Sequence, residues 1–439
     1  MRLARSVERV FFPLDEELAL LPGVLTPTLQ ETLVRLGTRM PFGSVVYELA
    51  CLKHLTTTEA TVRRHTEAAG AAYVALQTAA AERVERTLPA AAPGAARQLL
   101  SADGAMVPLV QGQWAEVKSV ALGSIQPPVL AQGEMVVHTE DLSYFSRLTD
   151  AETFNRLATV ETHRRGTERA EIVCAVSDGA EWIQGFVDLQ RHDAVRILDF
   201  SHAASYVTHV GEAVFGEGTA ELKSWLATTL HTLKHDSPVT VVQTLRNMQH
   251  GLEGGAASGE TLERVRTAIQ YLDKRVAQMD YARFQTAGYP IGSGSVESGN
   301  KVVVEARLKG AGMHWAREHV NPMVALRNVL CSGRWTDDWV QMATHLQTEH
   351  LQARQQRQRE RWIQRHARAA VNSPATLVSL APVAPPRPEP MPAPTVQANP
   401  ISSEKRKQPY RPPANHPWRH SPIGQARFKP SQRAANPKS

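Results

Sequence analysis

Apolar residues recur at helical spacing over the first part of the chain, residues 1–95. Segment 42–70 predicts two helices around a break, because Thr57 or Thr58 can cap the second helix and Gly70 can end it. This pattern is typical of a helix-turn-helix, and two adjacent helices of an ordinary bundle are the alternative. In a helix-turn-helix the second helix would contact DNA through the basic side chains Arg63, Arg64 and His65.

From residue 96 the pattern changes to short apolar runs, which predict strands. Three runs are expected to form an antiparallel meander: QLLSADGAMVPLV, WAEVKSVALGSI and MVVHTEDLSYF. A helical segment follows, and then two further runs, AEIVCAVSDGAEWI and AVRILDFSHA. This order is that of a ribonuclease-H-like sheet, in which the first and fourth strands lie side by side at the centre. We therefore expect an α/β fold with a mixed sheet of three antiparallel and two parallel strands.

Helical periodicity returns after the last strand, and a loop rich in Pro and Gly then precedes a helix that ends near Leu308. The C-terminal segment is rich in Pro and basic residues, and we expect it to be disordered because it buries too little apolar surface. The expected division is an N-terminal helical region at 1–95, a catalytic domain at 96–203 and 285–335, an all-helical insertion at 204–284, a basic helix at 336–370 that is solvated or lies on DNA, and a tail at 371–439.

Two of the predicted strands carry an aspartate followed by glycine, Asp103 in the first strand and Asp178 at the end of the fourth. Because these strands should be neighbours, their carboxylates are expected to converge. Glu297 lies in the first turn of the helix after the Gly-rich loop and can bring a third acid. Carboxylates are the ligands that Mg²⁺ or Mn²⁺ prefers, and two such ions promote in-line attack on a phosphodiester. The sequence thus predicts a metal-dependent enzyme acting on DNA, with Asp103 bridging the ions.

Each of these acids also has a purely structural interpretation. An Asp-Gly pair after an apolar run is typical of a hairpin turn, and a glutamate at a helix N-terminus interacts favourably with the helix dipole. Glu305 is a rival for Glu297 on the same helix. Candidates for DNA contact near this helix are Lys301, Arg307, Lys309 and Trp315, with Ser293, Ser295 and Asn300 as phosphate donors. Helix capping, a solvated face and core packing are the alternatives for these residues.

Composition narrows the cellular setting. The 439 residues include 49 Lys and Arg against 43 Asp and Glu, and this formal charge of +6 favours a polyanionic partner. Three scattered cysteines are too few for a disulfide framework and indicate a reducing compartment. The apolar patch near the start is interrupted by Asp15, Glu16 and Glu17, and no run approaches the about 20 apolar residues that span a bilayer. We expect a cytoplasmic protein without a membrane partner.

Several segments together resemble the ISKra-type insertion-sequence transposases, relatives of the Mutator-like DDE group. The quoted matches are SDGAEWI, ILDFSHAASYV and YPIGSGSVESGNKVVVEARLKGAGMHWAREHVNPMVALRNVLCSGRW, of which GSGSVES and RLKGAGMHW are the specific part. The resemblance extends from PLDEEL at residue 13 to PYRPPANHPWRHS at 409–421. Family members tend to carry a CxxC-like pair before the PLDE segment. This chain has no such pair, so we expect a shortened start.

The resemblance implies a bacterial transposase whose catalytic DDE set is Asp103, Asp178 and Glu297, holding two Mg²⁺ or Mn²⁺ ions. It also implies that Asp199 and His202 form an accessory Asp-x-x-His element, and Asp199 is the runner-up for the second catalytic acid. Such an enzyme binds double-stranded DNA at terminal inverted repeats as a homo-oligomer, cuts at the ends and joins them to target DNA. The alternatives are a ribonuclease-H-like nuclease without strand transfer and a transposase-derived DNA-binding regulator that lacks catalysis.

Overall fold

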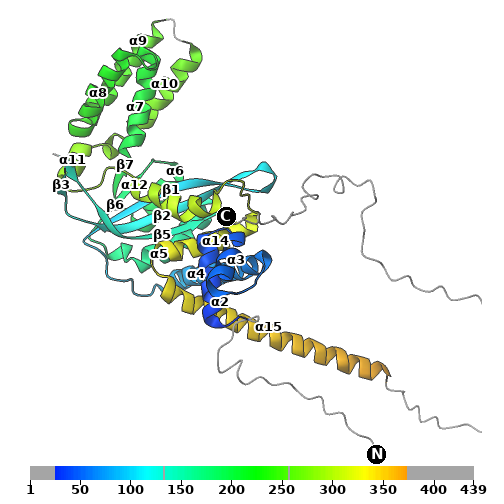
Figure 1. Ribbon diagram of the computed structural model, residues 1–439. Helices are drawn as coiled ribbons and strands as arrows, with labels where there is room; N and C mark the ends of the chain where they lie inside the picture. Colours follow the sequence, from blue (N-terminus) through cyan, green and yellow to red (C-terminus); the bar gives the residue numbers. More distant parts are fainter. Residues whose placement is uncertain (1–24, 132–133, 256–257, 373–439) are drawn as a thin grey trace, which may run out of the picture. The chain divides into compact units, whose positions relative to one another are not determined.

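A mixed sheet of five strands lies at the centre of the described part of the chain (Figure 1). The computed structural model describes residues 25–131, 134–255 and 258–372. The strand order is β5-β2-β1-β6-β7, with bounds β1 Arg97–Pro108, β2 Trp114–Ile125, β5 Thr139–Arg147, β6 Ile172–Ser177 and β7 Val195–Leu198. β1 pairs antiparallel with β2 and parallel with β6. The prediction that the first and fourth strands of this set are neighbours is therefore confirmed.

Both faces of the sheet are covered, which explains why the strands read as apolar runs. On one face, Leu100, Val120 and Phe145 pack with helices α5 (Ala151–Arg164) and α6 (Glu181–Arg191). On the other face, Val107 and Val117 pack under α12 (Gly294–Gly299), α13 (Ala306–Leu308) and α14 (Arg317–Cys331). Asp103 lies on this second face, because side chains alternate along β1.

One expected strand is divided. The run MVVHTEDLSYF contributes β4 (Glu134–Val136) and the start of β5, and β4 pairs with β3 (Val129–Ala131) in a separate two-stranded sheet. The break falls at Val137–His138, where the chain leaves one sheet and enters the other. Alternating apolar and polar residues do not reveal to which neighbour a strand pairs, so the sequence alone suggested one strand.

Helices α2 (Pro27–Arg39), α3 (Phe42–Lys53) and α4 (Glu59–Thr87) form the N-terminal part of the described chain. Thr58 caps α4 as expected, since its hydroxyl accepts from the amide of Thr61 at 3.2 Å. The prediction that Gly70 ends this helix is wrong, because α4 is 29 residues long and continues past Gly70 to Thr87. Gly70 instead lies against α14, where a Cβ would come within 2.2 Å of the Pro322 carbonyl oxygen. The glycine serves close helix packing.

The segment after β7 is helical, as predicted for residues 204–284, and its first helix begins at Phe200. Its helices are α7 (Phe200–Phe215), α8 (Ala220–His235), α9 (Pro238–Glu253) and α10 (Gly259–Asp273), followed by the short α11 (Tyr281–Thr286). Their apolar faces form one core cluster that also includes Leu99, Cys174 and Val176 of the sheet. This arrangement brings α10 and the start of α7 to the end of β6.

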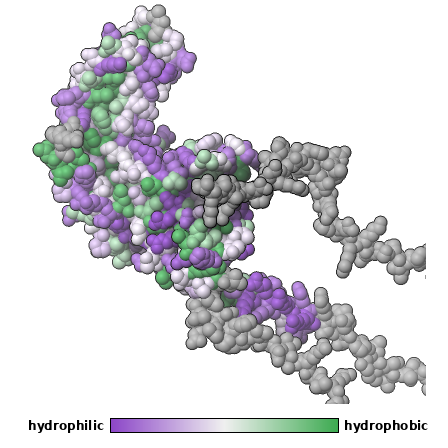
Figure 2. All heavy atoms as spheres, viewed as in Figure 1, coloured by the Kyte–Doolittle hydropathy of each residue, from purple (hydrophilic) through white to green (hydrophobic). Residues whose placement is uncertain are grey.

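The last long helix is α15 (Trp335–Asn372). Its residues 351–366 are all exposed, and Figure 2 shows its visible side chains as hydrophilic. The described residues from Leu25 to Val371 belong to one compact unit. Within the described residues, we find no helix that combines the length and apolar character needed to cross a membrane. The tail expected at 371–439 lies almost wholly outside the described residues.

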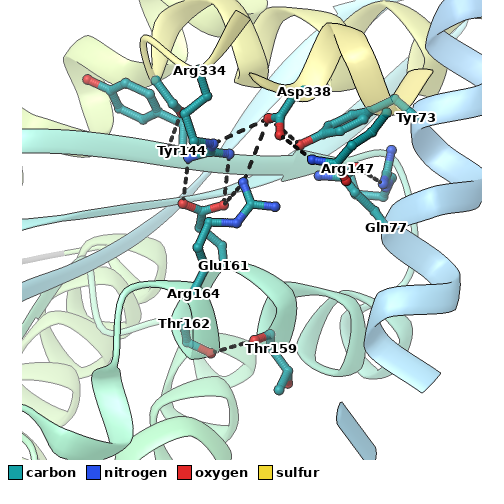
Figure 3. A network of polar contacts seen from close by, with 12 residues as sticks. Tyr73, Gln77, Tyr144, Arg147, Thr159, Glu161, Thr162, Arg164, Arg334 and Asp338 are labelled. Carbon is teal, nitrogen blue, oxygen red and sulfur yellow. Dashed lines mark hydrogen bonds and ion pairs between the residues drawn. The ribbon is translucent and has the colours of Figure 1, made fainter. Parts of the chain in front are cut away.

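A buried ionic network anchors the start of α15 (Figure 3). The carboxylate of Glu161 in α5 is fully buried. It accepts hydrogen bonds from both terminal nitrogens of Arg334, at 2.9 and 3.0 Å. Arg334 also contacts Asp338 at 3.4 Å, and the hydroxyl of Tyr73 donates to Asp338 at 2.7 Å. Helices α4, α5 and α15 are thus joined by bidentate and charge-assisted hydrogen bonds.

Candidate functional site

Asp103 lies within β1, opposite Ser119 of β2, and the strand continues to Pro108. The hairpin-turn alternative for this Asp-Gly pair is therefore wrong. In the parallel pairing of β1 with β6, Ser101 is level with Val176. The pairing ends there; Asp103 lies two residues further along β1, and Asp178 directly follows the end of β6 at Ser177.

Asp178 begins a turn from strand to helix. Gly179 has a positive φ of 77°, and its neighbour Ala180 donates its amide to the Asp178 carboxylate at 2.9 Å. Helix α6 begins at Glu181. The Asp-Gly pair is needed here because the chain must turn sharply at the carboxyl end of a central strand.

Glu297 lies in the first turn of α12, and both of its flanks are tied to the other acids. Before it, the hydroxyl of Ser293 donates to Glu297 Oε1 at 2.7 Å, while the amide of Ser293 donates to Asp199 Oδ2 at 2.6 Å. After it, Asn300 donates from Nδ2 to Asp103 Oδ2 at 2.9 Å. Residues three apart share a helix face, so Glu297 and Asn300 lie on the same side of this segment.

The charges of the three acids act on one another. Burial raises the pKa of Asp103, and the negative charges of Asp178 and Glu297 raise it further, although hydrogen bonds from Gly104 and Asn300 oppose the rise. A pKa raised by like charges means that the carboxylates share a neighbourhood. Asp178 and Glu297 therefore lie close enough to Asp103 for their charges to act on it.

His202 supplies a positive charge to this neighbourhood. Its Nε2 lies 3.7 Å from Asp178 Oδ2, and the contact raises the pKa of His202. Burial raises the pKa of Asp178, but His202 and the Ala180 amide outweigh it and leave that pKa below its usual value. His202 is therefore placed to neutralise Asp178.

Asp199 caps α7 and is buried. One carboxylate oxygen accepts from the amide of His202 at 2.8 Å and from the hydroxyl of Ser201, and the other accepts from Ser293. Burial is outweighed by these hydrogen bonds, so the pKa of Asp199 is lowered. Both carboxylate oxygens of Asp199 accept hydrogen bonds from the protein, so Asp199 connects α7 to the loop before α12. Asp178 therefore stays the favoured second acid.

Two further residues reach the site from α10. The hydroxyl of Tyr271 donates to the Asp178 carbonyl, and Arg275 donates from Nη2 to the Gly179 carbonyl at 2.7 Å. The guanidinium of Arg275 lies 3.8 Å from the centroid of the Tyr271 ring, and its charge helps to lower the pKa of Asp178. Sequence reasoning missed both residues, because nothing in the chain connects positions almost 100 residues apart.

The fit of this site to a divalent ion is mixed. Its carboxylate oxygens are hard donors, and the mutual repulsion of the acids would be relieved by a cation. Asn300 Oδ1 is a further oxygen, buried and without a hydrogen-bond partner among the described residues. Across the described ranges, however, no three Asp, Glu, His or Cys side chains are arranged to hold a metal ion. Asn300, Ser293 and His202 each engage one of the acids.

The DNA-contact candidates separate into exposed and buried residues. Arg63 and Arg64 are exposed on α4, Lys301 is exposed, and Lys309 pairs with Glu305 at 2.6 Å. These four stay predictions. His65 is buried, which removes it from the predicted DNA-contact face.

The structure corrects the predicted DNA contacts of Arg307 and Trp315. Arg307 is 2% exposed, donates from Nε to the Gly37 carbonyl at 3.0 Å, and lies over the rings of Phe42 and Trp315. Trp315 is 8% exposed and donates to the Leu308 carbonyl at 3.2 Å. Both side chains are core residues, so the predicted DNA contacts are wrong for this conformation. Sequence could not separate packing from binding here, since an aromatic ring and a guanidinium serve both.

Glu305, the rival third acid, is engaged by Lys309, whereas the charge of Glu297 acts on Asp103. The preference for Glu297 is consistent with that placement.

Comparison of the chain with protein-family models gave no match, and comparison with curated protein sequences gave no significant match. Family membership therefore stays a prediction from the quoted segments.

Proposed function

We propose that this chain is a DDE transposase of a bacterial insertion sequence, with a ribonuclease-H-like catalytic core. The observation that carries the proposal is that Asp103 and Asp178 follow the parallel pairing of β1 with β6, and that the charges of Asp178 and Glu297 raise the pKa of Asp103. The strand order and directions support the ribonuclease-H-like assignment. The resemblance of the quoted segments supports strand transfer.

In this proposal, Asp103, Asp178 and Glu297 hold two Mg²⁺ or Mn²⁺ ions, which would activate the attacking oxygen and stabilise the leaving oxygen. The protein side chains have simpler tasks. Asn300 fixes the orientation of Asp103, and Ser293 that of Glu297. His202 balances the charge of Asp178 before an ion is bound.

DNA would approach along exposed basic residues. Lys301 lies on the helical segment that carries Glu297, and Arg63 and Arg64 lie on the first turns of α4. Phosphate contacts of this kind position the duplex without selecting its sequence. The proposed enzyme acts on double-stranded DNA in the bacterial cytoplasm. Because two element ends must be brought together, it would act as a homo-oligomer.

Strand transfer is tested with a labelled duplex taken from the DNA that flanks the gene, a supercoiled target plasmid and Mg²⁺. We expect the wild-type protein to join the label to the plasmid, and Asp178→Asn to lose joining while it retains end binding. Asp193→Asn is the matched control, because Asp193 is an exposed aspartate that pairs with Arg191.

The other outcomes identify the alternatives. Metal-dependent cleavage without joining would identify the protein as a ribonuclease-H-like nuclease and not a transposase. End binding with equal, background cleavage in wild type and Asp178→Asn would favour a transposase-derived regulator.

A further inference from the structure

The helix that carries Glu297 changes its geometry at Asn300. Residues Asn300–Glu305 form a π-helical segment, η4, between α12 and α13, and the amide of Ala306 donates to the carbonyl of Lys301, five residues back. A π turn holds more residues than an α turn and is found frequently at functional sites. Here it begins at the residue that binds Asp103.

The wider turn lets one short helical segment direct some side chains to the site and others to the core. Asn300 binds Asp103, and Glu297 lies on the same side of the segment. Val303 and Val304, in contrast, are 1% and 0% exposed and lie in the core beneath it. An α-helix advances about 100° per residue, and the π turn changes that advance between the two pairs. The site-facing and core-facing side chains can therefore be oriented separately.

Arg327 of α14 holds this turn. Its side chain is 7% exposed, donates from Nε to the Val303 carbonyl at 3.3 Å and from Nη2 to the Val302 carbonyl, and reaches the Thr38 carbonyl from Nη1 at 3.3 Å. In the described ranges, Arg327 forms no ion pair with an acidic side chain. A buried charge without a counter-ion is costly. Its hydrogen bonds instead go to backbone carbonyls, two of them in η4.

We propose that Arg327 is a positioning residue of the site: by binding the η4 carbonyls, it sets the rotation of Glu297 and Asn300 toward Asp103. The inference rests on the proposed metal-dependent function. Arg327 touches neither the acids nor DNA in this assignment. It acts through the backbone turn.

The test measures Mn²⁺ affinity by calorimetry on the full chain, together with thermal unfolding, for Arg327→Met and Arg327→Lys. Residues that orient metal ligands from outside contribute about 10–100-fold to affinity. We expect Arg327→Met to weaken Mn²⁺ binding by about tenfold or more, and Arg327→Lys to recover part of the loss because an ammonium still donates to one carbonyl. The Mn²⁺ concentration needed for half-maximal end cleavage should rise in parallel.

Arg147→Met is the matched control. Arg147 is another buried arginine, 2% exposed, which donates to Gln77 at 2.6 Å (Figure 3). We expect this variant to lose thermal stability and keep wild-type Mn²⁺ affinity, because Arg147 does not contact η4. A folded Arg327→Met or Arg327→Lys that binds Mn²⁺ as the wild type does would overturn the positioning role and leave the proposed function intact. A wild-type protein that neither binds Mn²⁺ nor cleaves ends would refute the proposed function itself.

Discussion

Asp103 and Tyr73 are both polar groups inside packed layers, with opposite preferences for charge. The carboxylate of Asp103 is disfavoured by burial and by its acidic neighbours, so it gains from a cation. The hydroxyl of Tyr73 is neutral and donates to the carboxylate of Asp338 at 2.7 Å, so it gains from staying protonated. The first arrangement suits a ligand site, and the second suits a structural contact.

Tyr73 gives a prediction for stability at high pH. Burial raises the pKa of Tyr73 from 10.0 to about 12. A pKa that is raised in the folded state adds stability below pH 10, and this stability is lost as the pH rises through 12. A pKa difference of about two units between the folded and unfolded states corresponds to about 3 kcal/mol. Between pH 9 and pH 12, the free energy of unfolding in denaturant should fall by about that much more in the wild type than in Tyr73→Phe. Parallel pH curves for the two proteins would contradict this assignment.

At the residue scale, the sequence located the three acids but misjudged their surroundings. Asp103 and Asp178 were found because their positions on adjacent strands follow from strand order. Tyr271 and Arg275 were missed because only the packing of α10 brings them to the Asp178–Gly179 turn. Arg307 and Trp315 were placed on DNA because sequence does not show which way a side chain near a helix end points.

At the scale of elements, apolar periodicity predicted most helices and all five strands of the central sheet. Two departures have the same cause, which is that neighbouring elements decide local geometry. The sequence predicts a helix end at Gly70, whereas in the structure this glycine accommodates Pro322. The segment after Gly292 was expected to be a regular helix, and contacts from α14 coincide with its π turn. Neither neighbour can be inferred from local sequence.

A pair of glycine substitutions tests the role of Gly70. Gly70→Ala should lower the free energy of unfolding by about 1–3 kcal/mol, the usual cost of overpacking, because the new Cβ meets backbone of Pro322. Gly251→Ala in α9 meets no atom within 4 Å and should raise the free energy of unfolding by about 0.5–1 kcal/mol. Denaturant unfolding compares the two. Equal effects would mean that helix propensity, not packing, governs Gly70.

At the scale of the whole molecule, long-range polar contacts connect elements that the sequence keeps far apart. Glu161 and Arg334 join α5 to the start of α15 across 173 residues, inside a network that includes Tyr73 of α4. The sequence did not predict this network, since an isolated Glu or Arg on a helix usually lies on a solvated face. Burial of the pair follows from packing of helices against the sheet.

Breaking this network should be far more costly than breaking a surface pair. Glu161→Gln removes the bidentate partner of Arg334, leaves Asp338 as its one buried carboxylate partner among the described residues, and should lower the free energy of unfolding by about 3–5 kcal/mol. Glu82→Gln, which breaks the exposed pair with Arg86 on α4, should cost less than about 1 kcal/mol. Denaturant unfolding at neutral pH measures both. A Glu161→Gln variant as stable as Glu82→Gln would show that the network does not hold these helices together.

The central claim, that Asp103, Asp178 and Glu297 act as one metal site, is tested most directly by the stoichiometry of Mn²⁺ binding, measured by electron paramagnetic resonance. The account predicts two bound ions in the wild type, weakened binding in Asp103→Asn, Asp178→Asn and Glu297→Gln, and unchanged binding in Glu305→Gln. Absence of Mn²⁺ binding by the folded wild type, or equal binding by all four variants, would contradict it.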